Sequence, residues 1–305
     1  MGMGTGGAAD PLGQKSGRPE SDIHSLLHRV FDLGINLFDT APGYLDSEVI
    51  LGRALKSLPR DSCVVSTKIA LAGGMPGQPM KVMRGEDIEA AVNCSLQRLQ
   101  MSHVDLMLVG VAGPEFYDLF VNEHLPALQK LQQAGKIKFL GSSEQSRSDG
   151  DHQWLQKVLP LGALDVAMVA HNMINQSAQR TVFPLCRQVN LGVINVFTVR
   201  KVFSSPDRLR EVVRELKSHG VISPDSIPDD HPLGLLLQDG TISSVIEAAY
   251  RYAAYTDGVT SIMNGSSNLP VIEENIRSVL KGPLPADKVA RLRAIFGRVA
   301  EPIGN

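Results

Sequence analysis

The chain has 305 residues, 43% of them hydrophobic and 20% charged, so it holds ample apolar material for a large core and does not have the composition of a disordered chain. A formal net charge of −2 and a pI near 6.4 supply no broad positive field, so we expect small-molecule partners rather than nucleic acid. No apolar run reaches the roughly 18 residues of a membrane span and no signal-like segment opens the chain, so we expect a cytoplasmic protein without membrane contact.

From residue 20 onward, amphipathic helical stretches alternate with short runs rich in β-branched residues, a pattern typical of βαβ units. The first helix is expected to be capped by Ser21 or Asp22 and to end at Gly34. The expected strands cover residues 1–6, 35–39, 63–68, 104–109, 137–141, 165–169, 193–197 and 259–263. Eight such strands predict a (β/α)8 TIM barrel, in a single domain that spans residues 1–305.

Two connections, residues 70–85 and 224–240, are longer than a helix requires and are rich in Pro, Gly or Asp. In barrels the loops that follow the strands carry function, so both are candidates for loops over the site. Plain connections are the alternative. The oligomeric state stays open.

The N-terminal glycines, residues 2–7, match the pattern G-x-G-x-x-G of dinucleotide-binding folds. That pattern has meaning only between a strand and a helix, and neither condition is met here. We interpret these glycines as a loop of the first strand that lets a ligand approach the backbone closely.

Chemically useful side chains end the second and third expected strands. Asp39 is the last residue of its strand, Tyr44 follows in the next loop, and Lys68 ends the neighbouring strand. Because neighbouring strands lie about 4.8 Å apart, these ends converge at one rim of the barrel. A tyrosine is a poor proton donor or acceptor at neutral pH unless a nearby cation stabilises its phenolate form. Lys68 would provide that cation and Asp39 would hold it charged and oriented.

Two other interpretations of these residues stay open. They could form a rim salt bridge beside a packed tyrosine. Lys68 could instead form a Schiff base, although such a lysine must be neutral and the neighbouring Asp39 favours the ammonium form. The cysteines, Cys63, Cys94 and Cys186, are widely spaced and are expected to be reduced thiols, and we expect no metal site.

These motifs resemble the signature of the aldo-keto reductases. Phe38 to Tyr44 with Ser47 and Glu48 behind it, and Ser66 to Lys68 on the next strand, carry the resemblance. Further similar segments are residues 96–100, 104–108, 128–141, 264–267 and 273–275. The resemblance spans nearly the whole chain. Within the family, the chain resembles the sugar-oxidising galactose or arabinose dehydrogenase branch.

The resemblance implies a barrel that binds an extended nicotinamide cofactor and transfers hydride between it and a small carbonyl or alcohol, such as an aldose. Asp39, Tyr44 and Lys68 match three of the family's catalytic positions, with Tyr44 as the general acid and base. The fourth position is a histidine in the family and is Gly110 here. A water, Tyr117 or a loop side chain would have to replace it. His171 is the nearest candidate substitute in the sequence, with a structural role as its alternative.

The resemblance also implies where the cofactor lies. Ser142 and Ser143 match positions that hold the nicotinamide amide, and Glu144 stands where asparagine is usual. Residues that match or suit the rest of the cofactor are Thr198, Arg200 and Lys201 for the pyrophosphate and Ser266, Ser267, Glu274 and Asn275 for the adenosine end. Exposed loop charges are the alternative interpretation of Arg200 and Lys201.

The resemblance implies NAD or NADP as the cofactor, and the sequence favours NAD. Gly265 and Val271 stand where NADP-preferring relatives often carry basic residues, so a 2'-phosphate has no obvious partner besides Arg277. Gly110 and Glu144 keep a second function open. In that case the chain would be a cofactor-binding regulatory or structural protein with little catalytic activity.

Overall fold

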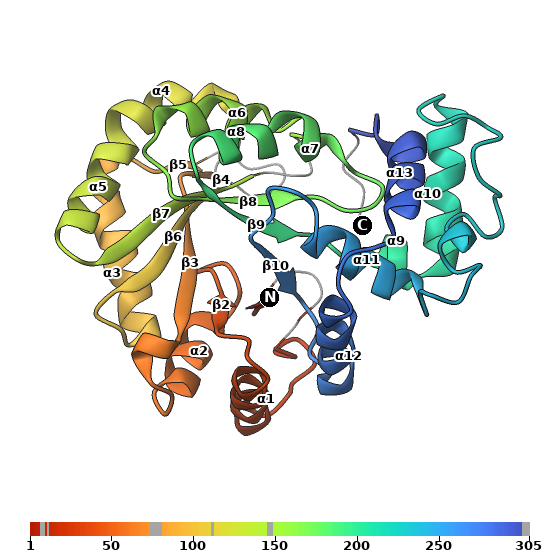
Figure 1. Ribbon diagram of the computed structural model, residues 1–305. Helices are drawn as coiled ribbons and strands as arrows, with labels where there is room; N and C mark the ends of the chain where they lie inside the picture. The colour runs from red at the N-terminus through yellow and green to blue at the C-terminus, as the bar shows by residue number, and fades with distance from the viewer. Residues whose placement is uncertain (7–9, 11, 74–80, 111–112, 145–148, 301–305) are drawn as a thin grey trace.

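The computed structural model describes residues 1–6, 10, 12–73, 81–110, 113–144 and 149–300. Within them, eight parallel strands form a closed barrel in the order β1-β10-β9-β8-β7-β6-β3-β2 (Figure 1). The strands are β1 (Gly2–Gly4), β2 (Leu37–Asp39), β3 (Val64–Ala70), β6 (Val104–Gly110), β7 (Ile137–Ser143), β8 (Val166–Ala170), β9 (Gly192–Val196) and β10 (Ser261–Asn264). β1 pairs with both β2 and β10 and so closes the ring, which confirms the expected (β/α)8 barrel.

Helices surround the barrel and follow the strands in the expected alternation. They are α1 (Glu20–Asp32), α2 (Ser47–Leu55), α3 (Ile88–Leu99), α4 (Tyr117–Leu119), α5 (Leu125–Gln133), α6 (Gln153–Val158), α7 (Ser177–Thr181), α8 (Phe183–Gln188), α9 (Lys201–Ser204), α10 (Pro206–Ser218), α11 (Val245–Ala254), α12 (Leu269–Leu280) and α13 (Ala286–Phe296). α1 begins at Glu20 after Pro19 rather than at a capping serine or aspartate, so the expected cap was wrong. Gly34 follows its end with φ +88°, a conformation that glycine adopts without strain.

Successive strand residues face opposite sides of the barrel wall. Leu106, Leu108, Met168 and Ile194 form a separate buried cluster that fills the barrel interior. The residues between them, among them Met107 and Val193, belong to the larger core between the strands and the helices. Residue parity along each strand therefore decides whether a side chain faces the interior or the helices.

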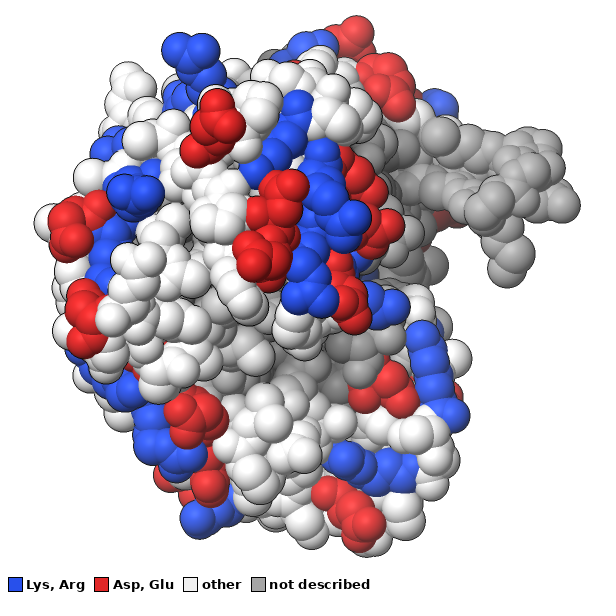
Figure 2. Space-filling model, turned by 90° about the vertical axis from the view of Figure 1, so that its right-hand side faces the viewer, with Lys and Arg blue, Asp and Glu red and all other residues white. Residues whose placement is uncertain are grey.

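A second core lies beside the barrel. It joins side chains of α10, α11 and α13 to the long connection 224–240, which contributes Ile227, Leu233 and Leu236. This packing gives that connection a structural role, which neither the expected site loop nor the plain connection included. Figure 2 looks onto the side of the molecule that carries α10 and α13, where acidic and basic side chains are interleaved.

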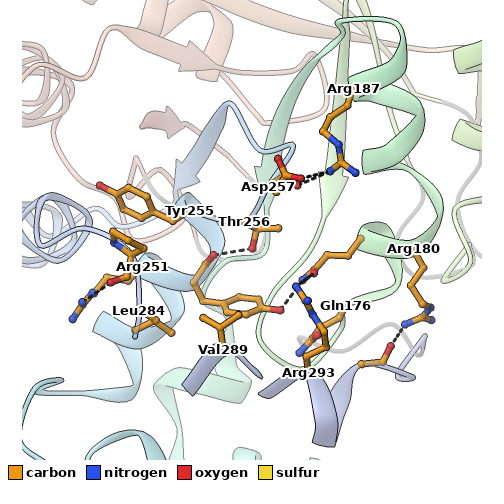
Figure 3. Close-up of a pocket in the computed structure, with 14 residues that line it drawn as sticks. Gln176, Arg180, Arg187, Arg251, Tyr255, Thr256, Asp257, Leu284, Val289 and Arg293 are labelled. Atoms are coloured by element: carbon orange, nitrogen blue, oxygen red, sulfur yellow. Dashed lines mark hydrogen bonds and ion pairs between the residues drawn. The ribbon is translucent and has the colours of Figure 1, made fainter. Parts of the chain in front are cut away.

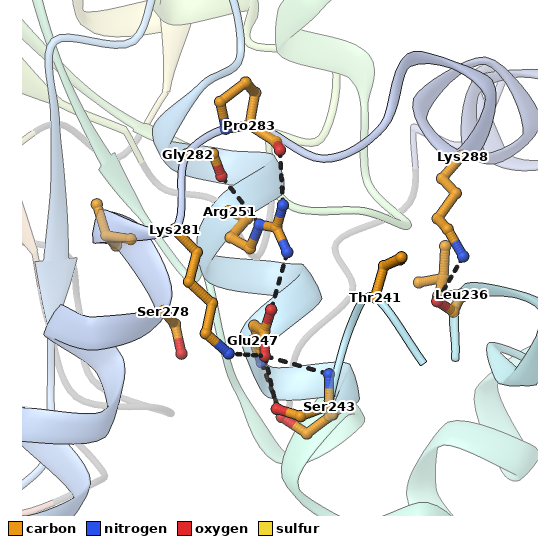
Figure 4. A network of polar contacts seen from close by, with 12 residues as sticks. Leu236, Thr241, Ser243, Glu247, Arg251, Ser278, Lys281, Gly282, Pro283 and Lys288 are labelled. Carbon is orange, nitrogen blue, oxygen red and sulfur yellow. Dashed lines mark hydrogen bonds and ion pairs between the residues drawn. The ribbon is translucent and has the colours of Figure 1, made fainter. Parts of the chain in front are cut away.

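Polar contacts tie this second core together (Figure 4). Glu247 of α11 is 1% exposed and pairs with Arg251 at 2.8 Å and with Lys281, after α12, at 2.7 Å. Buried Lys288 of α13 donates to the backbone oxygen of Leu236 at 2.8 Å. No helix of the described residues is both long enough and apolar enough to cross a membrane.

The other long connection, residues 70–85, contains an antiparallel hairpin of β4 (Ala72–Gly73) and β5 (Lys81–Val82). Residues 74–80, between the two strands, lie outside the described residues. The hairpin follows β3 directly, so it starts at the rim of the barrel where Lys68 lies.

Candidate active site at the mouth of the barrel

The centre of the site is a short ion pair between neighbouring strands. Lys68 Nζ on β3 lies 2.5 Å from Asp39 Oδ2 at the end of β2, and it also donates to the backbone oxygen of Thr40 at 2.9 Å. Asp39 Oδ1 accepts a hydrogen bond from Ser66 Oγ at 3.1 Å. The side chains of Lys68 and Asp39 are only 16% and 8% exposed, so their charges face each other with little water between them.

Tyr44 lies beside this pair. Its ring centroid is 5.0 Å from Lys68 Nζ, and its side chain is half-buried. The ring packs so closely against Gly6 that a Cβ at that glycine would fall 2.1 Å from Tyr44 Cγ. The glycine-rich start of the chain thus makes room for the tyrosine here, whereas Gly7 lies outside the described residues.

Three buried hydroxyls fix the loop that carries Tyr44. Ser47 Oγ lies 2.6 Å from Thr5 Oγ1 and 2.8 Å from Thr40 Oγ1. Thr5 Oγ1 also donates to the backbone oxygen of Asp39 at 2.9 Å. The ends of β1 and β2 and the start of α2 are therefore held together directly behind Asp39 and Tyr44.

Glu48 extends the same support outward to the helices. It is 1% exposed, and it accepts hydrogen bonds from Thr67 Oγ1 at 2.6 Å and from Arg98 Nε of α3 at 2.5 Å. Thr67 precedes Lys68 on β3, so Glu48 anchors the strand that carries the lysine. In the sequence, Ser47 and Glu48 are recognisable only as parts of a motif, because Glu48 lies 19 positions from Thr67 and 50 from Arg98 and no local pattern indicates these contacts.

Gly110 is the last residue of β6 and pairs with Ala70 at the same rim. A Cβ built on it would meet only the backbone oxygen of Ile69, at 3.7 Å, among the described residues. Space for a side chain therefore exists, but glycine places no hydrogen-bond donor there.

His171 faces away from the barrel interior. It is fully buried beside the rings of Phe183 and Tyr252, with ring centroids at 5.2 and 5.5 Å, and burial lowers the pKa of His171 to about 3. These surroundings favour its structural role over its role as a substitute donor. The ring of Tyr117, the other named candidate, lies 5.9 Å from Lys157 Nζ of α6, among the outer helices.

At the end of β7, the two serines expected at the nicotinamide face opposite sides of the barrel wall. Ser142 is buried on the outer side, donating to the backbone oxygen of Val109 at 3.1 Å and accepting from Trp154 Nε1 at 2.8 Å. Ser143, by strand parity, faces the interior, and it pairs with Gly110. Ser143 is therefore the better placed of the two serines.

Glu144 is turned into the protein. Its side chain is 1% exposed and lies 2.5 Å from Nδ1 of the equally buried His152, while its other oxygen accepts from the backbone N–H of Ala170 at 2.6 Å. Burial raises the pKa of the Glu144 carboxyl despite the neighbouring imidazole. The Glu144 carboxyl thus joins the end of β7 to β8 and to His152, which precedes α6.

The three residues expected at the pyrophosphate follow β9 and differ in their exposure and contacts. Thr198 is 1% exposed and accepts a hydrogen bond from Asn195 Nδ2 at 3.1 Å. The guanidinium of Arg200 stacks on the ring of Phe197 at 3.4 Å. Lys201 is exposed at the first position of α9.

At the expected adenosine end, Ser266 Oγ accepts the backbone N–H of Asn268 at 3.1 Å, just before α12. Ser267 offers its backbone oxygen to Arg18 Nη1 at 3.0 Å. Arg18 was not among the expected residues, because it lies 249 positions from its partner in the sequence and only the closed ring brings the two together.

The two α12 residues assigned to this end are both engaged. Glu274 pairs with Arg277 on the surface at 2.8 Å. Asn275 is 3% exposed and donates to Asn264 Oδ1 at 2.9 Å, so it faces the barrel wall. Of the adenosine-end residues, Ser266 and Ser267 thus lie in the loop itself, while Asn275 is held inside.

The chain is 28% identical over 295 residues to L-galactose dehydrogenase of Arabidopsis thaliana, covering 90% of this chain and 83% of the plant protein. It is 32% identical over 176 residues to NADH-specific methylglyoxal reductase of Escherichia coli (strain K12), covering 54% of this chain and 52% of that protein.

Solved structures share the fold. An aldo-keto reductase from Bacillus halodurans in its holo form matches with a TM-score of 0.70 and 21% identity, over 96% of this chain and 91% of that one. A second, from Klebsiella pneumoniae in complex with NADP and acetate, matches with a TM-score of 0.66 and 19% identity, over 100% of this chain and 93% of that one. The model of the Aldo/keto reductase family matches residues 1–296, in agreement with the resemblance that the motifs suggested. The chain therefore belongs to the aldo/keto reductase family of oxidoreductases.

Proposed function

We propose that this chain is a nicotinamide-dependent oxidoreductase that interconverts a small carbonyl compound and its alcohol, with Tyr44 as the general acid and base. The observation that carries the proposal is the position of Lys68 Nζ, 2.5 Å from Asp39 Oδ2 and 5.0 Å from the Tyr44 ring centroid. The similarity to L-galactose dehydrogenase over 90% of the chain supports an aldose as the substrate.

The donors around the mouth suit a nicotinamide dinucleotide. Ser143 beside Gly110 would hold the nicotinamide end, and the loop 265–268 before α12 offers backbone N–H groups at a helix N-terminus, a good environment for phosphate. Arg18 adds a guanidinium to that loop through its contact with Ser267. When bound, the nicotinamide supplies or accepts the hydride, and the side chains of the chain handle the proton.

The proton chemistry follows from the hydrogen bonds of Lys68. Asp39 and the backbone oxygen of Thr40 use two of the three N–H groups of the ammonium, so the third is left to stabilise negative charge on the Tyr44 oxygen. In reduction, Tyr44 gives its proton to the carbonyl oxygen while hydride reaches the carbonyl carbon. In oxidation, the phenolate takes the hydroxyl proton as hydride leaves the same carbon.

Gly110 leaves this centre without the histidine that the family uses to orient the carbonyl oxygen. A missing donor of this kind commonly lowers turnover by about 100-fold, so we expect a slow enzyme. Gly110→His is expected to raise kcat, because among the described residues a Cβ there meets only the Ile69 oxygen, at 3.7 Å. Gly110→Ala is the control, since it adds a Cβ at the same position without a donor; equal rates for the two variants would contradict this role.

Cofactor preference is expected to depend on Arg18. The lack of basic side chains at Gly265 and Val271 favours NAD, but the NADP complex of the Klebsiella relative does not support that preference. Arg277, the other candidate partner for a 2'-phosphate, is paired with Glu274. Arg18→Ala should therefore weaken NADPH binding more than NADH binding; equal effects on both would remove Arg18 from this role.

A cofactor-binding protein with little catalytic activity is the second candidate, favoured by Gly110 and by the inward turn of Glu144. Titration with NADH and NADPH by fluorescence, followed by a panel of aldoses, aldehydes and ketones, separates the two. Carbonyl-dependent loss of absorbance that Tyr44→Phe abolishes would support the enzyme. Binding without turnover in either direction would favour the second candidate, and no nicotinamide binding would refute both.

A further inference from the structure

A cavity of about 490 Å³ lies away from the Asp39–Lys68 centre, between α7 and α8 on one side and α11 and α13 on the other (Figure 3). None of the catalytic residues proposed above lines it. Its volume falls in the range of ligand pockets in proteins, which is roughly 300–1,000 Å³. We call it the arginine cavity, because Arg180, Arg187, Arg251 and Arg293 lie in its wall.

Two of these arginines are neutralised. Arg251 pairs with Glu247 at 2.8 Å and donates to the backbone oxygens of Gly282 and Pro283 (Figure 4). Its role in the cavity wall is therefore structural. Arg187 pairs with Asp257 at 2.8 Å, and Asp257 is the one acidic residue among those that line the cavity in the described part of the chain.

The partners described for the other two arginines are neutral. Arg180 of α7 donates to the backbone oxygen of Gly297, and Arg293 of α13 lies 3.3 Å from Gln179 Oε1. Two positive charges thus face one cavity in a chain whose net charge is −2, so they do not reflect an overall excess of basic residues. Each guanidinium group presents parallel N–H donors that match the oxygens of a phosphate group.

Polar groups deeper in the wall define the rest of a ligand. Gln176 is 1% exposed; its Nε2 donates to the backbone oxygens of Met173 at 2.7 Å and Leu292 at 3.3 Å, which fixes the amide orientation. Its Oε1 has no hydrogen-bond partner among the described residues, and a buried carbonyl in that state favours an incoming donor. Tyr252 accepts from Gln179 Nε2 at 2.6 Å, so its own O–H is free to donate.

We propose that the arginine cavity binds a small phosphate monoester that also carries a hydroxyl group. The phosphate dianion would balance the charges of Arg180 and Arg293 and accept from the Tyr252 hydroxyl. The ligand hydroxyl would donate to Gln176 Oε1. This site is separate from the proposed oxidoreductase centre and does not depend on it.

Isothermal titration calorimetry of the full chain with glycerol 3-phosphate tests the site, at an ionic strength of about 20 mM so that salt screens the charges weakly. Glycerol and inorganic phosphate, which each carry one half of the recognised chemistry, are the comparison ligands. We expect glycerol 3-phosphate to bind at least about tenfold more tightly than either. Equal affinity for inorganic phosphate, or no heat with the monoester at millimolar concentration, would overturn the proposal.

Arginine variants locate the binding. Arg180→Gln and Arg293→Gln should each weaken glycerol 3-phosphate binding by at least about tenfold. Arg291→Gln is the matched control, since Arg291 is exposed on the same helix as Arg293 but does not line the cavity. Circular dichroism and NADH titration check that each variant is folded. A loss with Arg291→Gln as large as with Arg293→Gln would refute the site.

Discussion

Replacing Glu48 with alanine is expected to destabilise the fold, because Glu48 links β3 to α3 through Thr67 and Arg98. The change removes a carboxylate that is 1% exposed and leaves Thr67 Oγ1 and Arg98 Nε without their acceptor. Breaking a buried pair by removing one partner costs about 3–5 kcal/mol. The Arg98 side chain is 35% exposed and can recover some hydration, so we place the loss near the lower end, at about 3 kcal/mol.

Scanning calorimetry gives the corresponding shift. For 305 residues the unfolding entropy is about 0.6 kcal/mol per kelvin, so a loss of about 3 kcal/mol lowers the unfolding midpoint by about 5 °C. Glu48→Gln keeps an acceptor for Thr67 and should lose less. Glu89→Ala, which breaks an exposed pair with Lys136, is the control and should leave the midpoint unchanged. If Glu48→Ala shifts the midpoint no more than this control, the buried linkage does not hold β3 as we infer.

Two further predictions concern single residues. Burial lowers the pKa of His171 to about 3, below its unfolded value of 6.5, so the unfolded chain takes up this proton first and stability falls by about 1.4 kcal/mol per pH unit below 6.5. His171→Gln should flatten the unfolding free energy between pH 6.5 and pH 5 in urea titrations; identical slopes would count against the buried neutral imidazole. Gly6→Ala would press a Cβ against the Tyr44 ring and should lower kcat by about 100-fold with NADH affinity retained, which steady-state kinetics checks and an unchanged kcat contradicts.

The barrel could be predicted from the sequence because its signal is local. Apart from β1 and β2, each barrel strand contains β-branched residues, the longer helices are amphipathic stretches, and this alternation predicts a parallel ring. Asp39 and Lys68 could be paired for a similar reason, since both lie towards the carboxyl ends of neighbouring strands, although β3 continues two residues beyond the expected end at Lys68, to Ala70. The predicted order of the strands therefore agrees with the structure, and so does the predicted proximity of Asp39 and Lys68.

The direction in which individual side chains face could not be predicted as well. Ser142 and Ser143 are adjacent and chemically alike, yet strand parity turns the first towards Trp154 and the second towards the interior. Asn275 faces inward because Asn264 offers it a partner from β10, a contact that closure of the ring creates. Arg18 reaches Ser267 for the same reason, across 249 positions of sequence. Such contacts depend on the folded ring, which no local window of sequence contains.

The apolar filling of the barrel has a consequence for how protons are supplied. Leu106, Leu108, Met168 and Ile194 close the interior with side chains that offer water no hydrogen bonds, so a chain of waters through the base of the barrel is not supported by this lining. If Tyr44, half-buried at the other end, is the general acid and base proposed above, it would exchange its proton with bulk solvent through the mouth. A bound ligand that covers the mouth would then also cut the tyrosine off from solvent, so that each catalytic cycle runs on the one proton enclosed with it.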